Sequence, residues 1–377
     1  MISTKNLRIL VVDDTIVYRK AVSDIIEEIP GVELAGVAHN GKIALSKIQT
    51  LKPDILTLDI EMPEMNGIEV LMELQKSHPG IGVIMLSTLT SEGSDMTMRA
   101  LELGAFDFIL KPQSKNQIEG KREIRAALEP ILKAFAKSRY ASSLISSKGR
   151  ISGPTSLPSS SVSTKPAVGT RIFKPLGTKP TAVRRGKSEI VAIGISTGGP
   201  NALNQMLPQL PGNLGVPVLI VQHMPPVFTK SLAASLDKKC VLTVKEAVNG
   251  ENILPNVVYI APGGKQMKLM AGTDGQNRRI KITDDPPENS CKPSVDYLFR
   301  SVADYYVGRT TAVIMTGMGS DGTLGLGVLK QKSAFIIGQD ESSCIVYGMP
   351  KAPAELGYLD IVAPLGKIAE EIVNSVK

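Results

Sequence analysis

A serine between two glycines is the first residue of this chain whose surroundings suggest a reaction. Ser196 lies between Gly194 and Gly198, directly after the apolar run 190–195 and shortly before a helical pattern. This G-x-S-x-G spacing is typical of a sharp strand-to-helix turn that exposes a serine nucleophile. The same glycine-rich turn could instead bind a phosphate at the start of its helix. The choice depends on whether the chain also supplies a base and an acid.

A base for this serine is available at one position. A serine hydroxyl becomes a good nucleophile when a neighbouring base removes its proton. His39 and His78 lie in the first part of the chain, whereas His223 follows an apolar run in the same part as Ser196. In a parallel sheet both residues would lie at the carboxyl edge of the strands. We therefore predict that His223 is the general base.

An acid that orients this histidine has four candidates. Asp321 follows the apolar run 311–315 inside a glycine-rich turn, which favours it over Asp284, Asp285 and Asp296. Such a carboxylate fixes the tautomer of the imidazole. The resulting order, Ser…His…Asp, differs from the Ser…Asp…His order of ordinary α/β-hydrolases. The sequence therefore predicts a serine hydrolase outside the commonest esterase fold.

A second set of polar residues ends several apolar runs near the start of the chain. Carboxylates gathered at one edge of a sheet repel each other unless a cation lies among them, and Mg²⁺ prefers oxygen ligands. A carboxylate beside Mg²⁺ and a lysine is suited to accept a phosphoryl group, because the cations neutralise its charge. Acids that merely cap surface helices are the alternative. The residues concerned are Asp13, Asp14, Asp59, Ser87 and Lys111.

Alternating strand and helix patterns would position both sets of residues. Short apolar runs separated by helical patterns predict an α/β fold, with parallel sheets covered by helices on both faces. We expect a doubly wound domain at 1–132 and a second, Rossmann-like and mainly parallel domain at 188–377, with a β-hairpin insertion within 257–283. The expected strands are 8–14, 33–38, 54–60, 82–87, 107–110, 190–195, 217–221, 257–260, 265–270, 279–283, 311–315 and 334–337.

The segment 133–187 differs from both expected domains. From Pro130 to Ser188 the chain has no Asp or Glu but twelve Lys and Arg, so the rest carries a net charge of −5 although the total is +7. Its Ser- and Pro-rich composition buries too little apolar surface to offset the entropy of ordering. We expect a flexible basic linker, and contact with an acidic partner is the alternative.

Composition argues against several other classes of protein. The chain has no Trp and only 4% aromatic residues, which disfavours a base-stacking surface for nucleic acid. No apolar run is long enough to span a bilayer, and the N-terminal residues do not form a signal peptide. Cys240, Cys291 and Cys344 show neither disulfide nor metal spacing. We therefore expect a cytoplasmic protein without a membrane span.

The first domain resembles a response-regulator receiver domain. The resemblance rests on VVDD, DIEMPEMNG, LST and KP. It implies a flavodoxin-like fold, phosphorylation of Asp59 by a chemotaxis histidine kinase, and Mg²⁺ bound by Asp13 or Asp14 together with Asp59 and the backbone carbonyl of Glu61. It further implies a switch hydroxyl, a phosphate-binding lysine and a switch aromatic, at Ser87, Lys111 and Phe108.

The second domain resembles the catalytic domain of bacterial chemotaxis protein-glutamate methylesterases. The resemblance rests on GISTGGP, VQHMP, YIAPGG, KPSVDYLF and MTGMGSDG. It implies Ser196 as nucleophile, His223 as base and Asp321 as the acid that orients it. It also implies that the backbone N–H groups of Thr197 and Met318 bind the oxyanion.

Two positions depart from the residues frequent in that family. Lys292 stands where arginine is frequent, and Gln266 stands where histidine is frequent. Lysine cannot form the bidentate contacts of arginine. We therefore expect that either change could alter contact with the receptor.

Together the two resemblances imply a phosphorylation-regulated esterase of two-component signalling. The substrate would be a glutamate methyl ester on the cytoplasmic helices of a chemoreceptor, cleaved with release of methanol, and receptor glutamines would be deamidated by the same route. Mg²⁺ would belong to the receiver, and the esterase would need no cofactor. The unphosphorylated receiver would cover the cleft that holds Ser196. The alternatives are a receiver-controlled nucleic-acid-binding regulator and a serine hydrolase of another ester.

Overall fold

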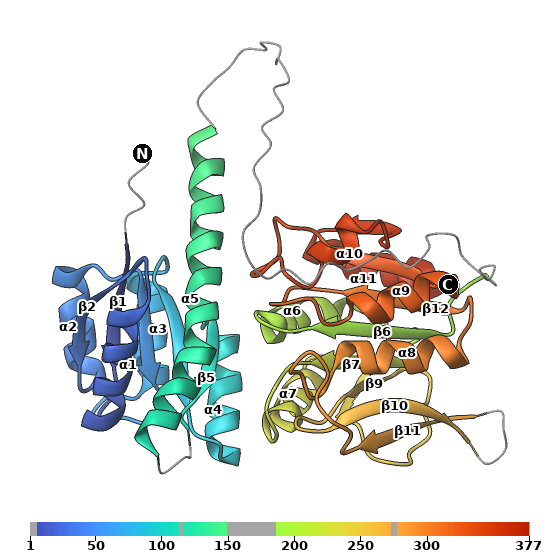
Figure 1. Ribbon diagram of the computed structural model, residues 1–377, viewed down its shortest axis with the longest axis horizontal. Coiled ribbons are helices and arrows are strands. Elements are labelled where there is room, and N and C mark those ends of the chain that lie inside the picture. The colour runs from blue at the N-terminus through green and yellow to red at the C-terminus, as the bar shows by residue number, and fades with distance from the viewer. Residues whose placement is uncertain (1–5, 113–115, 149–185, 273–276, 377) are drawn as a thin grey trace.

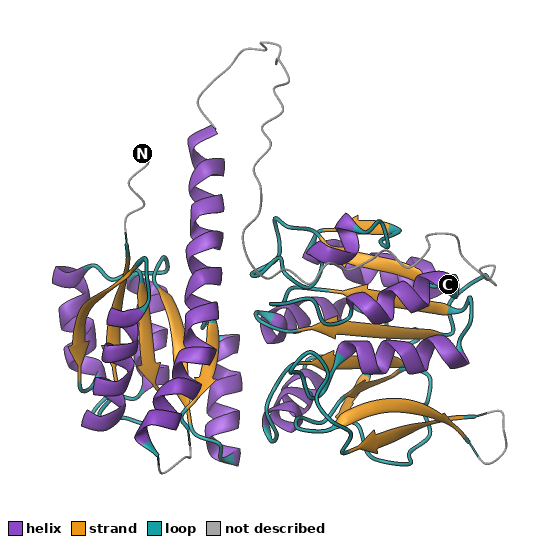
Figure 2. Cartoon of the chain, in the orientation of Figure 1, coloured by secondary structure: helices purple, strands orange, loops and turns teal. Residues whose placement is uncertain are grey.

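The chain folds into two α/β domains that lie side by side (Figure 1). The computed structural model describes residues 6–112, 116–148, 186–272 and 277–376, with only the backbone described from 137 to 148. Most of the expected linker therefore lies outside the described residues. In both domains helices cover the two faces of the main sheet (Figure 2), as the α/β prediction required.

The first domain contains a five-stranded parallel sheet. Its strand order, β2-β1-β3-β4-β5, is the flavodoxin-like order expected for a receiver. The elements are β1 (Leu7–Val12), α1 (Ile16–Glu28), β2 (Val32–Ala38), α2 (Gly41–Leu51), β3 (Ile55–Asp59), α3 (Gly67–Ser77), β4 (Gly82–Ser87), α4 (Ser91–Glu102), β5 (Asp107–Leu110) and α5 (Gln117–Lys148).

The loop after β3 shows how local sequence positions a strand end. Asn66 caps α3 by accepting a hydrogen bond from the N–H of Glu69, whose carboxylate accepts one from the N–H of Asn66. The next residue is Gly67, where a Cβ atom would come within 2.2 Å of the carbonyl oxygen of Asp59. The absence of a side chain therefore lets the capped helix begin directly against the end of β3.

The second domain is built on a seven-stranded sheet of order β14-β13-β12-β6-β7-β9-β8, in which all paired strands are parallel. Strands β10 and β11 pair antiparallel in a separate sheet, which confirms the expected hairpin. The elements are β6 (Ile190–Ile195), α6 (Gly199–Met206), η1 (Leu207–Gln209), β7 (Val218–Gln222), α7 (Phe228–Asp237), β8 (Thr243–Glu246), β9 (Val257–Ile260), β10 (Gln266–Ala271), β11 (Arg278–Thr283), α8 (Val295–Tyr305), β12 (Thr310–Ile314), α9 (Thr323–Gln331), β13 (Phe335–Gln339), α10 (Lys351–Glu355), β14 (Ile361–Ala363) and α11 (Leu365–Val376).

Four elements of this domain were not predicted. Strands β8 and β14 form the two edges of the large sheet, and the helices α10 and η1 are single short turns. β8 reads TVKE, with Val244 as its one apolar residue, while β14 has only three residues. Edge strands bury less surface than central ones, so their sequences lack the continuous apolar run by which the central strands were recognised.

Helix α5 extends past residue 132, where we expected the first domain to end, and runs to Lys148. The added residues include Ala, Leu and Lys, which favour helices. Among the described residues, no helix combines the length and the apolar character needed to cross a membrane.

Candidate functional site

Ser196 lies in the tight turn between β6 and α6. Gly198 has a φ of +73°, which disfavours any residue with a side chain. A Cβ atom on Gly199 would come within 1.9 Å of Oε1 of Gln222. Pro200 occupies the first turn of α6, where its missing N–H costs little. The glycines and the proline thus form the strand–turn–helix geometry that the sequence predicted around Ser196.

His223 and Asp321 follow the two strands that flank β6 in the sheet, β7 and β12. Nε2 of His223 lies 2.8 Å from Oδ2 of Asp321, and both side chains are largely buried. Ser196, His223 and Asp321 therefore follow three adjacent strands and line one cavity at the same edge of the sheet. Asp284 and Asp285, two of the alternatives to Asp321, have exposed side chains and lie outside this contact.

The carboxylate of Asp321 is held by a dense set of donors. Its Oδ1 accepts hydrogen bonds from Oγ of Ser294 at 2.9 Å and from the N–H of Asp296 at 3.1 Å, and its Oδ2 accepts from the N–H of Val295 at 2.7 Å. Burial acts to raise the pKa of Asp321, but the hydrogen bonds from His223 and from these N–H groups outweigh it and lower the pKa. Asp321 therefore stays ionised opposite the imidazole.

Asp296, the remaining alternative, is fully buried beside Asp321 and does not contact His223 directly. Burial raises the pKa of Asp296 to about 7, although the N–H of Gly325 donates to it. Nδ2 of Asn289 lies 2.9 Å from Asp296 and 3.4 Å from Asp321. Asn289 and Ser294 thus hold the two carboxyl groups in place, a role that sequence reasoning did not identify.

The imidazole of His223 has one ring nitrogen facing Asp321 and the other facing a cysteine. Burial disfavours its charged form, but hydrogen bonds with Asp321 and Cys291 outweigh burial and raise the pKa of His223 to about 9. Sγ of Cys291 lies 3.8 Å from Nδ1. Among the described residues no hydrogen bond joins Ser196 Oγ to the imidazole, so Nδ1 is the nitrogen that remains for it. Catalytic hydrogen bonds are often long before substrate binds.

Two backbone N–H groups near Ser196 have fixed directions. The carbonyl of Ser196 accepts hydrogen bonds from Nε2 of Gln222 at 3.0 Å and from the N–H of Gly199 at 2.7 Å. In a trans peptide the C=O and N–H groups point in opposite directions, so the N–H of Thr197 points away from these partners. Gln222 immediately precedes His223 in the chain, but nothing in the sequence revealed this contact.

The peptide before Met318 is oriented in the same way. The carbonyl of Gly317 accepts hydrogen bonds from the N–H groups of Gly348 at 3.1 Å and Met349 at 2.8 Å. Within the described part of the chain, neither the N–H of Met318 nor that of Thr197 donates to a protein acceptor. Both residues line the same cavity as Ser196.

The structure corrects one expectation about receptor contact. Gln266 is completely buried, with Oε1 accepting from the N–H of Ser294 at 2.8 Å and Nε2 donating to the carbonyl of Pro286 at 3.1 Å. It therefore supports the loop that carries Ser294 and cannot touch a receptor. Lys292 is partly exposed and donates to the carbonyl oxygen of Asp284.

In the first domain, the expected charged residues meet at the carboxyl edge of the sheet. Nζ of Lys111 lies 2.7 Å from Asp59 and 2.9 Å from Asp13. Burial raises the pKa of Asp59 to about 6; Lys111 opposes this shift, while Asp13 and Asp14 add to it. Carboxylate oxygens of the three aspartates lie within 4.8 Å of one another. Glu61 and Asp14 border a common hollow of about 510 Å³.

Ser87 contacts helix α4, and Phe108 contacts the second domain. Oγ of Ser87 accepts a hydrogen bond from Oγ1 of Thr97 at 2.7 Å and donates to the carbonyl of Gly93 at 3.3 Å, both in α4. The ring of Phe108 stacks on Phe228 of the second domain, with 4.8 Å between centroids and 13° between planes. The expected switch residues therefore contact α4 and the other domain.

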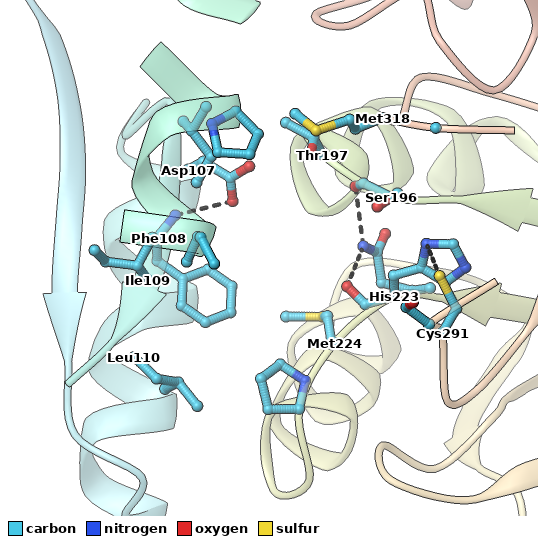
Figure 3. Close-up of a pocket in the computed structure, with 18 of the residues that line it drawn as sticks. Asp107, Phe108, Ile109, Leu110, Ser196, Thr197, His223, Met224, Cys291 and Met318 are labelled. Atoms are coloured by element: carbon cyan, nitrogen blue, oxygen red, sulfur yellow. Dashed lines mark hydrogen bonds between the residues drawn. The ribbon is translucent and has the colours of Figure 1, made fainter. Parts of the chain in front are cut away.

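The two domains enclose a cavity of about 950 Å³. Asp107 and Phe108 of the first domain line one side of it, and Ser196, His223 and Met318 line the other (Figure 3). Access to Ser196 is thus bounded by the first domain.

Helix α4 of the first domain packs against α6 and α7 of the second. Polar contacts join them: Ser94 to Ser231 at 2.8 Å, Asn201 Nδ2 to the carbonyl of Ala105 at 3.1 Å, and Lys239 to Glu102 at 2.6 Å.

Comparison with known proteins assigns both domains to described families. The family model for CheB methylesterase matches residues 191–372, and that for the response regulator receiver domain matches residues 9–122. A protein-glutamate methylesterase/protein-glutamine glutaminase of Desulfotalea psychrophila is 61% identical over 99% of each chain. One of Trichodesmium erythraeum is 39% identical over 98% of this chain and 99% of its own. The crystal structure of the Thermotoga maritima CheB methylesterase catalytic domain, 44% identical, covers 50% of this chain and 98% of that chain with a TM-score of 0.48.

Proposed function

This chain belongs to the CheB methylesterase family, as an enzyme that joins a receiver domain to a protein-glutamate methylesterase domain, and we propose which of its residues carry the reaction. The observation that carries the proposal is that Ser196, His223 and Asp321 follow three adjacent strands and line one cavity, with His223 hydrogen-bonded to Asp321. The comparisons support the esterase and neither of its alternatives, a nucleic-acid-binding regulator or a hydrolase of another ester.

In the proposed reaction, Oγ of Ser196 attacks the carbonyl carbon of a glutamate methyl ester. The proton of Oγ passes to Nδ1 of His223, while Asp321 accepts the hydrogen bond from Nε2–H and stabilises the imidazolium. The tetrahedral oxyanion is bound by the N–H groups of Thr197 and Met318, whose directions are set by the anchored carbonyls beside them.

The intermediate then collapses and expels the leaving group. His223 returns its proton to the methoxide oxygen, and methanol leaves an acyl-enzyme on Ser196. Water enters, His223 takes one of its protons, and the hydroxide attacks the acyl carbon to free the glutamate carboxylate and Ser196. A receptor glutamine would follow the same route with ammonia as the leaving group, in keeping with the glutaminase activity in the names of the relatives.

The receiver would hold Mg²⁺ among oxygen ligands. The fit rests on the three carboxylates of Asp13, Asp14 and Asp59, which converge within 4.8 Å and repel each other without a cation. The backbone carbonyl of Glu61 would complete the set. When bound, Mg²⁺ supplies positive charge to the phosphoryl group transferred from a histidine kinase to Asp59. Lys111 already contacts Asp59 and would bind the same phosphoryl group.

Phosphorylation would act on the contact between the two domains. A receptor helix is about 10–12 Å wide, so the receiver residues that line the cavity must move before a helix can bring its methyl ester to Ser196. Ser87 is bonded to α4, which packs against α6 and α7, and Phe108 is stacked on Phe228. Drawing Ser87 towards phosphoryl-Asp59 would break its bonds to α4 and loosen this contact.

The remaining assignments follow from this scheme. The receiver would occupy 1–132, the methylesterase domain 188–377, and the segment 133–187 would tether them while they separate. The partners would be the cytoplasmic helices of chemoreceptors and a chemotaxis histidine kinase, which places the enzyme in the cytoplasm.

The test is methanol release from methylated receptor membranes, measured with and without acetyl phosphate and Mg²⁺. The full-length protein should release methanol faster with the phosphodonor, and Ser196→Ala should release none in either condition. Methanol release by Ser196→Ala at a rate near that of the unchanged enzyme would refute the proposed nucleophile. A response to acetyl phosphate that persists in Asp59→Asn would refute the proposed phosphorylation site.

A further inference from the structure

One of the three cysteines differs from the others in its surroundings. Burial, together with nearby acidic side chains, raises the pKa of Cys240 to about 11 and that of Cys344 to about 12, which keeps both thiols protonated. Cys291 instead lines the cavity that contains Ser196, and its Sγ lies 3.8 Å from Nδ1 of His223. The mechanism proposed above makes no use of this thiol.

Cys291 and His223 have the spacing of two ligands of one metal ion. Bonds of about 2.3 Å from Zn²⁺ to sulfur and about 2.0 Å to nitrogen, at tetrahedral angles, put the two ligand atoms about 3.5 Å apart. The observed 3.8 Å is close to this value. A carboxylate oxygen of Asp321, Sγ of Cys291 and a ring nitrogen of His223 also lie within 4.8 Å of one another.

Asp321 would not bind the ion itself but would hydrogen-bond to the histidine ligand of such a site. Histidine ligands of zinc commonly donate their second ring N–H to a carboxylate, which fixes the tautomer and raises the basicity of the ligating nitrogen. His223 already has Nε2 directed at Asp321, so its Nδ1 lone pair points to the side where Cys291 lies.

The loop that carries the cysteine is held in place before any ion arrives. The N–H of Cys291 donates to the carbonyl of Glu288 at 2.7 Å, and the N–H of Glu288 donates back at 3.1 Å. Nε2 of the buried Gln266 lies 3.4 Å from the carbonyl of Cys291. The ligand positions are therefore organised by the fold, which lowers the entropic cost of binding.

We propose that Sγ of Cys291 and Nδ1 of His223 form an inhibitory site for a thiophilic divalent cation such as Zn²⁺. Asp321 holds the imidazole, and the remaining coordination positions open to the cavity and to water. The thiol releases its proton when the ion binds. The ion occupies the lone pair with which His223 takes the proton of Ser196, so the bound enzyme cannot form its nucleophile. The inhibition rests on the proposed function, whereas the binding does not.

This site and the one in the receiver differ in the metal ions that their ligands prefer. A thiolate and an imidazole select zinc-like ions, whereas the carboxylates of Asp13, Asp14 and Asp59 suit Mg²⁺. Millimolar Mg²⁺ can therefore saturate the receiver without filling the site at Cys291, and the two metals can be varied independently in one assay.

The first experiment measures inhibition. Full-length protein is activated with acetyl phosphate and Mg²⁺, and methanol release is followed while ZnCl₂ is added and then removed with a zinc-selective chelator. Each variant is compared with its own rate in the absence of zinc. Cys291→Ser should need at least about tenfold more zinc for half-inhibition than the unchanged protein. Cys344→Ser, the matched control, should be inhibited at the same concentration as the unchanged protein. Equal sensitivity of Cys291→Ser and Cys344→Ser would overturn the proposal.

The second experiment measures binding without any catalysis. Co²⁺ replaces Zn²⁺ in full-length Ser196→Ala with Mg²⁺ present, and the near-ultraviolet absorption band of a cobalt–thiolate bond is recorded. The band should appear in Ser196→Ala and be absent from the double variant Ser196→Ala/Cys291→Ser. Absence of the band from Ser196→Ala would overturn the metal site. A band without zinc inhibition would instead overturn the inhibitory role of the ion while leaving Cys291 as a metal ligand, so the two failures are distinguishable.

Discussion

The proposed phosphorylation site and the proposed esterase site occupy the same kind of place in two similar folds, yet the pKa of a buried carboxylate is shifted in opposite directions in the two sites. Asp59 and Asp321 are each 2% exposed at the carboxyl edge of a parallel sheet. The pKa of Asp59 is raised to about 6, whereas that of Asp321 is lowered. Burial alone therefore does not determine how readily either group ionises.

The difference lies in the neighbours of each carboxylate. Asp59 has Lys111 as its ion-pair partner and two further aspartates beside it, so its negative charge is only partly compensated. Asp321 accepts hydrogen bonds from a histidine, a hydroxyl and backbone N–H groups, which together stabilise its negative charge. The partly compensated charge around Asp59 favours binding of a further cation, which suits phosphoryl transfer. The hydrogen bonds around Asp321 keep the carboxylate ionised beside the imidazole, which suits a triad.

The largest expected effect separates the two sites completely. Ser196→Ala should lower methanol release by about 10⁶-fold, because the nucleophile and its base act as a unit. It should leave phosphorylation of Asp59 by acetyl phosphate unchanged, because Ser196 lies in the other domain. Methanol release and acid-labile phosphate are measured on the same preparation. Loss of both activities together would indicate a folding defect and contradict the independence of the two sites.

Replacing the oriented carboxylate should have the next largest effect. Asp321→Asn should reduce kcat by about 10⁴-fold, since the amide no longer stabilises the imidazolium or holds the same tautomer. The equivalent change in the receiver, Asp59→Asn, should leave the basal rate intact and remove only the response to acetyl phosphate. Comparable basal rates in Asp321→Asn and Asp59→Asn would contradict the different roles proposed for the two carboxylates.

The pH dependence tests the charge state of the base. His223 acts in its neutral form, and its pKa of about 9 means that lowering the pH below 9 protonates more of it. The rate should therefore rise about tenfold per pH unit between pH 6 and 8 and level off near pH 9. The pKa is obtained from the pH profile of kcat/KM, measured on full-length protein in the continuous presence of the phosphodonor. A plateau that begins near pH 6.5 would show that Asp321 and Cys291 do not raise the pKa.

Replacing Gln222 should have a smaller effect on kcat, because Gln222 orients a donor to the oxyanion, the N–H of Thr197, and does not itself donate to the oxyanion. Gln222→Met keeps a similar volume but removes the bond to the carbonyl of Ser196, so the N–H of Thr197 loses part of its alignment. We expect kcat to fall about tenfold, less than the 10²–10³-fold cost of deleting a donor, with KM unchanged. A rise in KM without a fall in kcat would assign Gln222 to substrate binding.

The smallest expected effect concerns the contact between the domains. Phe108→Ala removes a stacked aromatic pair worth about 0.5–1.5 kcal/mol and should raise the basal rate of methanol release two- to tenfold. Phe106→Ala is the matched control, because Phe106 pairs edge-on with Phe135 of helix α5. An equal rise in both variants would attribute the effect to a destabilised receiver.

The sequence by itself determined the fold class and most of the strand ends. Central strands of parallel sheets are buried on both faces, so runs such as 82–87 and 190–195 are recognisable without any structure. Parallel strands also end at a common edge, so polar residues that follow them, such as Ser196 and His223, could be expected to converge. The edge strands β8 and β14 were missed because they are short or half-polar.

Which side chains contact one another at that edge of the sheet could be learned only from the tertiary structure. The contact of His223 with Asp321, the anchoring of Ser196 by Gln222 and the burial of Gln266 depend on hydrogen bonds between distant segments. The same holds for Cys291 beside His223, which are 68 residues apart. Periodicity and turn signals act over a few residues, whereas such contacts depend on strand order and loop packing, which no short stretch of sequence encodes.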